Sequence, residues 1–427
     1  MPTKPDVAAS SDNVLDIRDL SVRFELGGDA LARLFGRSTG TVHAVDGVNL
    51  SLRKGEVVGL VGESGSGKST LGRALLGLVP AADGSIVFGG NDIAGYSRRQ
   101  LREHRRHAQM VFQDPNAALN PAMTVEQGVG DALRIQGVKS AEERRRRVID
   151  ALEHVGLSPV DLFLPKYPRD LSGGQKQRVV IARAIVMGPT LLVADEPISM
   201  LDMSVRAKIL QLMLDLKREF DLTYVYITHD LASAKFFCDR IAIMYLGRIV
   251  ELGDTEKIFA DPKHPYTKAL LAAIPDPDPS RSLPRQLLTG EIPDAARPPL
   301  GCSFHPRCPA AFEKCGWEPR DLVAALEKHW LKAAAATYDV ERSKIANLDA
   351  LASQEGGSAK LQPSRSGSVA DLRDLLEEVK TDPANEAFWR GVREVRDTDG
   401  AVEVVFHEGS DPMLRDSGSV EVACHLF

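Results

Sequence analysis

Alternation of apolar and polar residues near the start of the chain predicts a half-buried strand over residues 14–25 (VLDIRDLSVRFE). The Gly-rich residues 27–40 lack periodicity and are predicted to form a loop. Two uninterrupted apolar runs, LLVADEP and LTYVYITHD, end in acidic or histidine residues. Such runs are typical of buried parallel strands that carry functional groups at their C-terminal ends, so this part of the chain is predicted to be an α/β domain.

The pattern changes after about residue 261, where proline becomes frequent (PKHPYT, IPDPDPSRSLP). Residues 317–352 favour helix, residues 353–368 (SQEGGSAKLQPSRSGS) are predicted to be a flexible linker, and residues 369–415 hold a predicted helix and strand. Two arginine-rich runs, RRQLREHRRH and AEERRRRVID, are interpreted as solvated helix faces rather than binding patches.

Composition narrows the class of protein. The 427 residues include 53 Lys plus Arg and 59 Asp plus Glu, for a net charge of −6, which argues against a dedicated nucleic-acid binder. The longest apolar candidate for a membrane span, residues 179–194, is interrupted by Arg183, and the first 13 residues are polar. We therefore expect no membrane-spanning segment and no signal peptide, and a protein that stays in the cytosol.

One glycine-rich segment matches a phosphate-binding loop. The order G-x-x-x-x-G-K-[ST] follows the apolar strand VVGLV, and it lets successive backbone N–H groups point at an anion. Lys68 is suited to bind the β- and γ-phosphates of a nucleoside triphosphate, and the Ser69 hydroxyl is suited to Mg²⁺. The candidate binding residues are Gly62, Glu63, Ser64, Gly65, Ser66, Gly67, Lys68, Ser69 and Thr70.

An acidic pair ends the later apolar strand. Asp195 is a candidate carboxylate ligand for the phosphate-bound Mg²⁺, and Glu196 is a candidate base for the attacking water. An acidic pair after a strand can also simply begin a helix, and the pair alone does not separate these interpretations.

The sequence Leu171-Ser172-Gly173-Gly174-Gln175 opens another predicted helix and supplies a second anion-binding N-terminus. With it, the chain resembles the ATP-binding-cassette (ABC) ATPases, whose signature is LSGGQ. The resemblance implies a P-loop NTPase fold with a RecA-like core, an antiparallel β subdomain and a helical subdomain. It also implies that the signature caps the γ-phosphate bound to a partner's loop, so that the active unit is a dimer.

Further positions match that family in order. By resemblance, Gln113 in VFQDP contacts Mg²⁺ or water, Asp202 in ISMLD is the D-loop aspartate, and His229 in ITHD holds the γ-phosphate. Phe24 stands where the family stacks an aromatic ring on adenine, although a core phenylalanine is the alternative. The implied reaction is in-line attack of water on the γ-phosphate, with Glu196 polarising the water.

Longer segments resemble the ATPases of dipeptide, oligopeptide and nickel importers over about residues 14–315. The segments are AVDGVNLSLRKGE, QDPNAALNPAMTV, HDLASAKFFCDRIAIMYLGRIVE and HPYTKALLAAIP. The resemblance implies a peripheral protein on the cytoplasmic side of the cell (inner) membrane. Its partners would be two permease subunits, a second and nonidentical ATPase subunit and, indirectly, an external solute-binding protein.

Some of these implications leave alternatives open. Residues 116–124 are expected to contact the permease, with a plain surface loop as the alternative. A nickel or other solute importer would use the same motor. A soluble ABC ATPase acting on nucleic acid or ribosomes is the rival from another class, but the second cassette, long coiled coil and basic surfaces typical of it are missing from the sequence.

Four cysteines lie late in the chain: Cys302, Cys308, Cys315 and Cys424. Closely spaced thiols among Gly and Pro residues suggest soft-metal ligands. By resemblance to peptide-importer ATPases the group is a [4Fe–4S] cluster, with tetrahedral Zn²⁺ or no metal as alternatives. His305 or His425 could replace Cys424 as the fourth ligand.

The resemblance implies a few tens of residues between the last two cysteines, whereas 108 residues separate Cys315 and Cys424 in this chain. The separation suggests a small domain inserted between them. The predicted organisation is a disordered leader (1–13), an ABC nucleotide-binding domain (14–260), a Pro/Cys-rich C-terminal region (261–315), the inserted domain (316–416) and a terminal segment (417–427).

Overall fold

The computed structural model describes residues 13–26, 40–274 and 290–427. It divides into two compact units, Met1–Asp261 (unit 1) and Pro262–Phe427 (unit 2), each described here by itself. The first strand already begins at Asn13, so the predicted leader is one residue too long. Residues 1–12 of the leader and residues 27–39 of the predicted loop lie outside the described residues.

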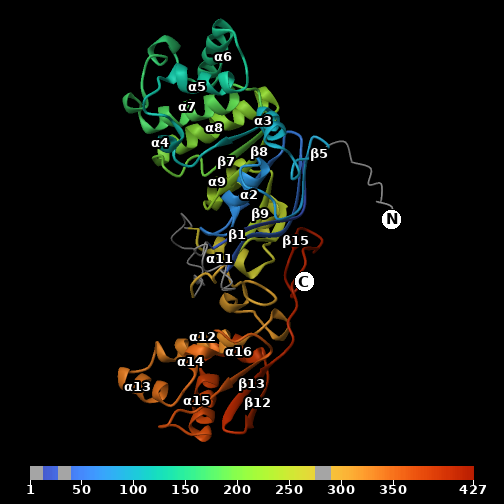
Figure 1. The fold of residues 1–427 in the computed structure, drawn as a ribbon, viewed down its shortest axis with the longest axis vertical. Coiled ribbons are helices and arrows are strands. Elements are labelled where there is room, and N and C mark those ends of the chain that lie inside the picture. Colours follow the sequence, from blue (N-terminus) through green and yellow to red (C-terminus); the bar gives the residue numbers. More distant parts are fainter. Residues whose placement is uncertain (1–12, 27–39, 275–289) are drawn as a thin grey trace, which may run out of the picture. The chain divides into compact units, whose positions relative to one another are not determined.

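Unit 1 contains a central sheet with the strand order β10-β9-β3-β8-β7-β6 (Figure 1). Strands β9, β3, β8, β7 and β6 run parallel, and β10 pairs antiparallel with β9. Every residue of β3, β7 and β8 is buried, as their uninterrupted apolar runs predict. The strands are β3 (Val57–Val61), β6 (Ala108–Val111), β7 (Leu191–Asp195), β8 (Thr223–Thr228), β9 (Arg240–Tyr245) and β10 (Arg248–Asp254).

A second, antiparallel sheet in unit 1 has the order β2-β1-β4-β5. Leu15 and Ile17 of β1 are buried while Arg18 and Asp19 are exposed, which confirms the predicted half-buried strand. The strands are β1 (Asn13–Glu25), β2 (Thr41–Arg53), β4 (Asp83–Phe88) and β5 (Asn91–Asp92).

Helices of unit 1 divide between the sheet and a separate helical group. Helix α2 packs against β7 and β8, whereas α5, α6 and α7 pack against one another (Figure 1). The helices are α2 (Lys68–Leu75), α3 (Arg98–His107), α4 (Pro115–Ala118), α5 (Val125–Ile135), α6 (Ala141–His154), α7 (Gly173–Ile185), α8 (Met203–Phe220), α9 (Leu231–Phe237) and α10 (Thr255–Ala260), with short 3-10 turns at η1 (Val160–Leu162) and η2 (Pro168–Asp170).

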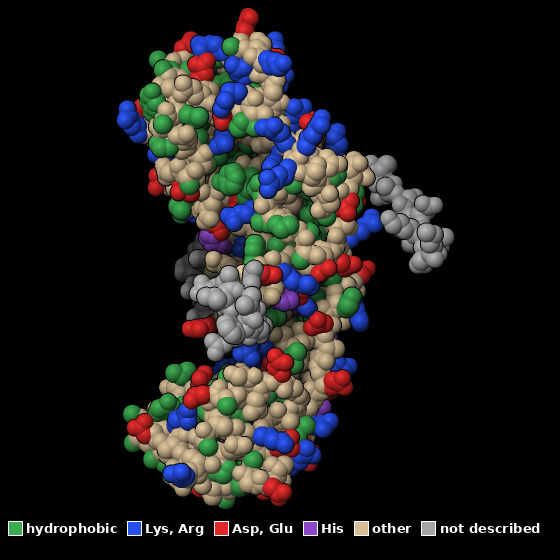
Figure 2. Space-filling view, viewed as in Figure 1, with side chains coloured by type: hydrophobic (Ala, Val, Ile, Leu, Met, Phe, Trp, Pro, Cys, Tyr) green, Lys and Arg blue, Asp and Glu red, His purple; other side chains and the backbone are tan. Residues whose placement is uncertain are grey.

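The two arginine-rich runs form α3 and α6, and Figure 2 shows Lys and Arg side chains gathered over the upper part of unit 1. Most residues of α3 are exposed, as the prediction of a solvated face expects, but two of its side chains contact the end of α2. His104 is buried, and Arg105 donates to the backbone oxygens of Leu76 and Gly77. These polar groups satisfy the C-terminal end of α2, which has carbonyl oxygens without partners in its own helix.

Unit 2 contains a three-stranded antiparallel sheet of order β11-β13-β12 packed with helices around one hydrophobic core. Its helices are α11 (Pro265–Ala272), η3 (His305–Arg307), η4 (Glu313–Cys315), α12 (Pro319–Trp330), α13 (Ala335–Ser343), α14 (Leu348–Leu351), α15 (Val369–Thr381), η5 (Pro383–Asn385) and α16 (Glu386–Arg390). Its strands are β11 (Ser358–Leu361), β12 (Val392–Thr398), β13 (Ala401–Phe406), β14 (Arg415–Asp416) and β15 (Glu421–Val422).

The predicted linker at residues 353–368 is wrong, because β11 lies inside it. Ala359 and Leu361 are fully buried and alternate with exposed Lys360, and β11 pairs with β13. The Gly and Ser residues around this strand concealed a four-residue alternation. Helix α15 and strand β13 confirm the helix and strand predicted after residue 369. None of the helices in the described ranges has the length and apolar character needed to cross a bilayer.

Candidate functional site

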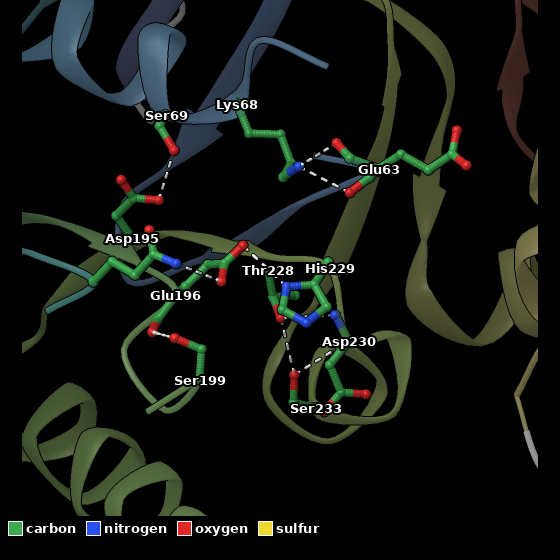
Figure 3. A network of polar contacts seen from close by, with 12 residues as sticks. Glu63, Lys68, Ser69, Asp195, Glu196, Ser199, Thr228, His229, Asp230 and Ser233 are labelled. Carbon is green, nitrogen blue, oxygen red and sulfur yellow. Dashed lines mark hydrogen bonds and ion pairs between the residues drawn. The ribbon is translucent and has the colours of Figure 1, made fainter. Parts of the chain in front are cut away.

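The glycine-rich loop connects the buried strand β3 to helix α2 and closes around the side chain of Lys68 (Figure 3). The ammonium of Lys68 donates to the backbone oxygens of Gly62 and Glu63, each at 2.8 Å, and to the Ser66 hydroxyl at 3.3 Å. Burial lowers the pKa of Lys68, while the nearby carboxylates, Glu196 foremost, oppose that shift. The loop therefore holds one cation at its centre, directed toward its own backbone.

Two glycines of the loop are required by close contact with other strands. A Cβ atom on Gly62 would lie 2.1 Å from the backbone oxygen of Met244. A Cβ atom on Gly67, whose φ is 97°, would lie 2.0 Å from the backbone oxygen of Ala44. Any larger side chain would have to displace backbone, so the loop conformation depends on glycine at both positions.

Ser69 and Asp195 form a pair of oxygen donors beside the loop. The Ser69 hydroxyl donates to Asp195 Oδ1 at 2.9 Å, across the gap between α2 and the end of β7 (Figure 3). Burial raises the pKa of Asp195, and the hydrogen bond from Ser69 opposes that shift. Hydroxyl and carboxylate oxygens are the donors that Mg²⁺ prefers, so the two side chains fit the predicted ion chemically.

The Glu196 side chain contacts two other predicted site residues, Gln113 and His229, which come from distant segments of the chain. Its carboxylate accepts from Gln113 Nε2 at 3.1 Å and lies 3.0 Å from His229 Nδ1. The Glu196 backbone has a φ of 46°, which costs a non-glycine residue roughly 1–3 kcal/mol. The Ser199 hydroxyl donates to the Glu196 backbone oxygen and supports this conformation. The structure thus places the candidate base Glu196, Gln113 and His229 in one hydrogen-bonded group.

A polar turn formed by Thr228, Asp230 and Ser233 flanks His229, and the motifs named above do not include it. Thr228 Oγ1 accepts from the Asp230 N–H at 3.0 Å and lies 3.4 Å from the Ser233 hydroxyl, which donates to the Asp230 backbone oxygen at 2.8 Å (Figure 3). The sequence signal for this turn was available, since a Thr followed two residues later by a helix-capping Asp is typical of a side-chain-stabilised turn.

The signature residues 171–175 form the N-terminal end of helix α7. Ser172 caps α7, accepting from the Gln175 N–H at 3.3 Å, and Gln175 Oε1 accepts from the Ser172 N–H at 3.0 Å. A Cβ atom on Gly174 would approach Val205 Cγ1 to 2.8 Å. This helix belongs to the α5–α7 group, whereas the phosphate loop lies on the central sheet (Figure 1). Within this chain the two predicted phosphate-binding elements are therefore on separate parts of unit 1.

Two further candidates lie at the surface. Asp202 occupies the N-cap position of α8 and is exposed. The ring of Phe24 near the end of β1 is 41% exposed, so it is not part of the core.

The four late cysteines all belong to unit 2. Burial foremost, with a smaller contribution from repulsion by Cys315 and Cys424, raises the pKa of Cys308 to about 12. Burial likewise raises the pKa of Cys302 and Cys315, and in both the charge of Cys424 adds to the shift. In the described residues, however, these cysteines do not form a group of three or more ligand atoms lying within 4.8 Å of one another, so the structure shows no clear metal site at the thiols.

His305 lies beside the cysteines with both ring nitrogens engaged. Its Nδ1 lies 2.9 Å from the Cys302 backbone oxygen, and its Nε2 lies 3.2 Å from Asp321 Oδ2. A metal-ligating imidazole needs one free nitrogen, so the structure does not support His305 as a substitute ligand.

Comparisons with known proteins agree with this geometry. A family model described as "ABC transporter" matches residues 45–199, and one described as "Oligopeptide/dipeptide transporter, C-terminal region" matches residues 250–315. The oligopeptide transport ATP-binding protein AppF of Bacillus subtilis is 42% identical over 327 residues, covering 76% of this chain and 98% of that protein. The oligopeptide transport ATP-binding protein OppF of Salmonella typhimurium is 45% identical over 319 residues, covering 74% and 94%.

Among solved structures, cbiO1 from Clostridium perfringens, part of the ABC transporter complex cbiONQ, is 32% identical, with a TM-score of 0.50. The match covers 58% of this chain and 92% of that one. The chain belongs to the ABC transporter family of ATP-binding proteins, and it is an ATPase that converts ATP and water to ADP and phosphate. Within this family it carries the C-terminal region of the oligopeptide/dipeptide transporters.

Proposed function

We propose that this chain is the ATP-hydrolysing motor subunit of a membrane importer of peptides. The observation that carries the proposal is the combination of the Gln113–Glu196–His229 group with the peptide-transporter region at residues 250–315. The first supplies a site for hydrolysis, and the second is shared with relatives that are named as oligopeptide transport proteins.

In the proposed mechanism, the loop of residues 62–70 holds the phosphates of ATP. Lys68 turns from its backbone acceptors to the β- and γ-phosphate oxygens, which carry more negative charge. Glu196 accepts a proton from the attacking water, while His229 Nδ1 holds the Glu196 carboxylate in place and the γ-phosphate lies beside the ring.

The proposed Mg²⁺ would be held by Ser69, Asp195 and Gln113. Bound there, it would neutralise charge on the phosphate oxygens. Asp195 suits the role because its carboxylate lies beside the Ser69 hydroxyl at 2.9 Å, and an adjacent cation would favour the charged form that burial disfavours.

We further propose that two ATPase subunits act as a pair, this chain with a nonidentical one. The signature residues Ser172, Gly173, Gly174 and Gln175 of one subunit, together with Asp202, would complete the site on the other subunit's loop. Asp202 follows Leu201, whose side chain lies 3.7 Å from a Cβ atom placed on Gly173. Support comes from the placement of the signature helix on a part of unit 1 distinct from the chain's own loop. Phe24 would stack on adenine, and its exposure leaves the ring accessible.

Residues 116–124 are the proposed contact with two permease subunits on the cytoplasmic side of the inner membrane. This segment follows Gln113 directly and is tied to the signature helix. Lys176 Nζ donates to Asn116 Oδ1 at 2.9 Å, and Arg183 donates to the Ala118 backbone oxygen at 2.6 Å. A change at the nucleotide would therefore reach the segment from two sides, through Gln113 and through α7.

Copurification tests this function. The full chain, expressed with its natural neighbours and extracted in detergent, should bring down two permeases and a second ATPase. Peptide added with an external binding protein should stimulate hydrolysis. Recovery of ribosomes or nucleic acid without permeases would contradict the proposal. Stimulation of hydrolysis by nickel but not by peptide would indicate that the transported solute is nickel.

We also propose a [4Fe–4S] cluster held by Cys302, Cys308, Cys315 and Cys424. The proposal rests on the number and type of donors, since four cysteine thiolates are the usual ligands of a [4Fe–4S] cluster and these four cysteines form no disulfide. When bound, the cluster would link the two ends of the inserted domain, residues 316–416. Anaerobic purification should yield about four irons per chain with visible absorbance, whereas stoichiometric zinc without iron would contradict the proposal.

A further inference from the structure

Three side chains able to bind a metal ion meet in unit 2, apart from the cysteines and the nucleotide site. His329 lies near the end of α12, Glu341 on α13 and Glu378 on α15. One ligand atom from each lies within 4.8 Å of the other two. Because the three residues come from three different helices, this convergence is a product of the tertiary fold.

His329 and Glu341 have the spacing of two ligands on one ion. His329 Nε2 and Glu341 Oε2 are 3.4 Å apart, beyond the usual 2.7–3.2 Å of an N–H···O hydrogen bond. Two ligands of a tetrahedral ion, each about 2.1 Å from it, are about 3.4 Å apart. Glu378 is exposed, so its carboxylate can approach by a side-chain rotation without movement of α15.

Helix α13 gives the reason to expect an ion. Its buried residue is Glu341, a carboxylate, while Tyr338 and Val340 on the same helix are 42% and 57% exposed. Burying a charge is costly unless the charge is paired. Trp330 Nε1 donates to Glu341 Oε2 at 2.8 Å, which satisfies one lone pair and leaves the charge to be balanced.

Among the described residues, Lys332, close to His329 in sequence, is paired with another carboxylate. Lys332 donates to both carboxylate oxygens of Asp382, at 2.8 and 3.0 Å. In the described residues, the ion pair of Glu341 is with His329, which is charged only when protonated. With a neutral imidazole, the three side chains carry two negative charges and present one nitrogen and two oxygen ligands.

We propose that His329, Glu341 and Glu378 bind a divalent transition-metal ion, Zn²⁺, which tethers α13 to α12 and α15. Imidazole nitrogen and carboxylate oxygen are both zinc ligands, and water would complete the coordination. The Trp330 indole holds the Glu341 carboxylate in place, as outer hydrogen bonds do at metal sites. The ion would stabilise the small domain and is independent of the transport assignment.

The test compares the full chain with Glu378→Gln and, as the matched control, Glu377→Gln. Both glutamates are exposed and adjacent on α15, so neither change should prevent folding. After chelator treatment without nucleotide, each protein is titrated with Zn²⁺ while hydrogen exchange is measured in residues 335–343. This local readout separates the site from zinc held by the cysteines.

Wild type and Glu377→Gln should show slower exchange in α13 when Zn²⁺ is added. Glu378→Gln should require at least roughly 10-fold more Zn²⁺ for the same protection, because even outer partners of metal ligands typically contribute 10–100-fold. His329→Gln should behave like Glu378→Gln. Two outcomes would overturn the proposal: zinc binding that does not slow exchange in α13, or equal responses in all four proteins. In either case, the contact between His329 and Glu341 would be an ion pair without a metal ion.

Discussion

Replacing Glu196 by Gln tests the centre of the proposed mechanism. The substitution keeps the volume of the side chain and one carbonyl oxygen to accept from Gln113, which lies 3.1 Å from the carboxylate. What it removes is the ability to take a proton from water and the negative charge beside Lys68 and His229. The nucleotide site should therefore keep its shape and lose its base.

The expected magnitude follows from those contacts. General-base catalysis contributes typically 10²–10⁴-fold, so kcat should fall by about that factor, equivalent to about 3–5 kcal/mol in the activation barrier. Binding of ATP should not weaken, because Glu196 is the carboxylate that most raises the pKa of Lys68 and it would repel the γ-phosphate. The variant should thus bind ATP at least as tightly as wild type.

Phosphate release and equilibrium binding of labelled ATP, measured on the assembled transporter, separate the two effects. Glu256→Gln is the matched control, because Glu256 is exposed on α10 and takes no part in the site. Its turnover should equal that of wild type. A kcat for Glu196→Gln within about tenfold of wild type would refute the role of Glu196 as base.

Two further predictions concern the loop and the small domain. Gly62→Ala should abolish nucleotide binding and lower the melting temperature, because the added Cβ would lie 2.1 Å from a backbone oxygen. In the control Gly128→Ala, on α5, the added Cβ has nothing within 4 Å, so this change should be neutral or stabilising. Nucleotide binding is measured for both variants, and normal binding by Gly62→Ala would contradict the prediction. Hydrogen bonds from Arg396 and then Ser358 hold the pKa of Glu403 below its ordinary 4.5. The contribution of the charged Glu403 side chain to folding stability is present above pH 4.5, and it is lost as the pH falls through the lowered pKa of Glu403. Glu403→Gln should therefore flatten the loss of melting temperature between roughly pH 5 and 3, and an unchanged acid profile would contradict this role.

The local sequence pattern was sufficient to predict the segments that form much of the candidate site. The phosphate loop, the acidic pair and the capped signature helix each lie within a few consecutive residues, where backbone preference and side-chain capping act directly. The buried parallel strands follow from uninterrupted apolar runs for the same reason. Strand β11 was missed because only four residues alternate within a Gly- and Ser-rich segment.

Contacts between distant segments were decided by the tertiary structure. Gln113 and His229 meet Glu196 across 83 and 33 residues, and nothing in their local sequence specifies which atoms they contact. Likewise the burial of His104, the approach of Met244 to Gly62 and the convergence of His329 with two glutamates depend on packing. Periodicity determines which face of a helix or strand is buried, but the partner of that face is selected by sheet register and side-chain fit over the whole fold.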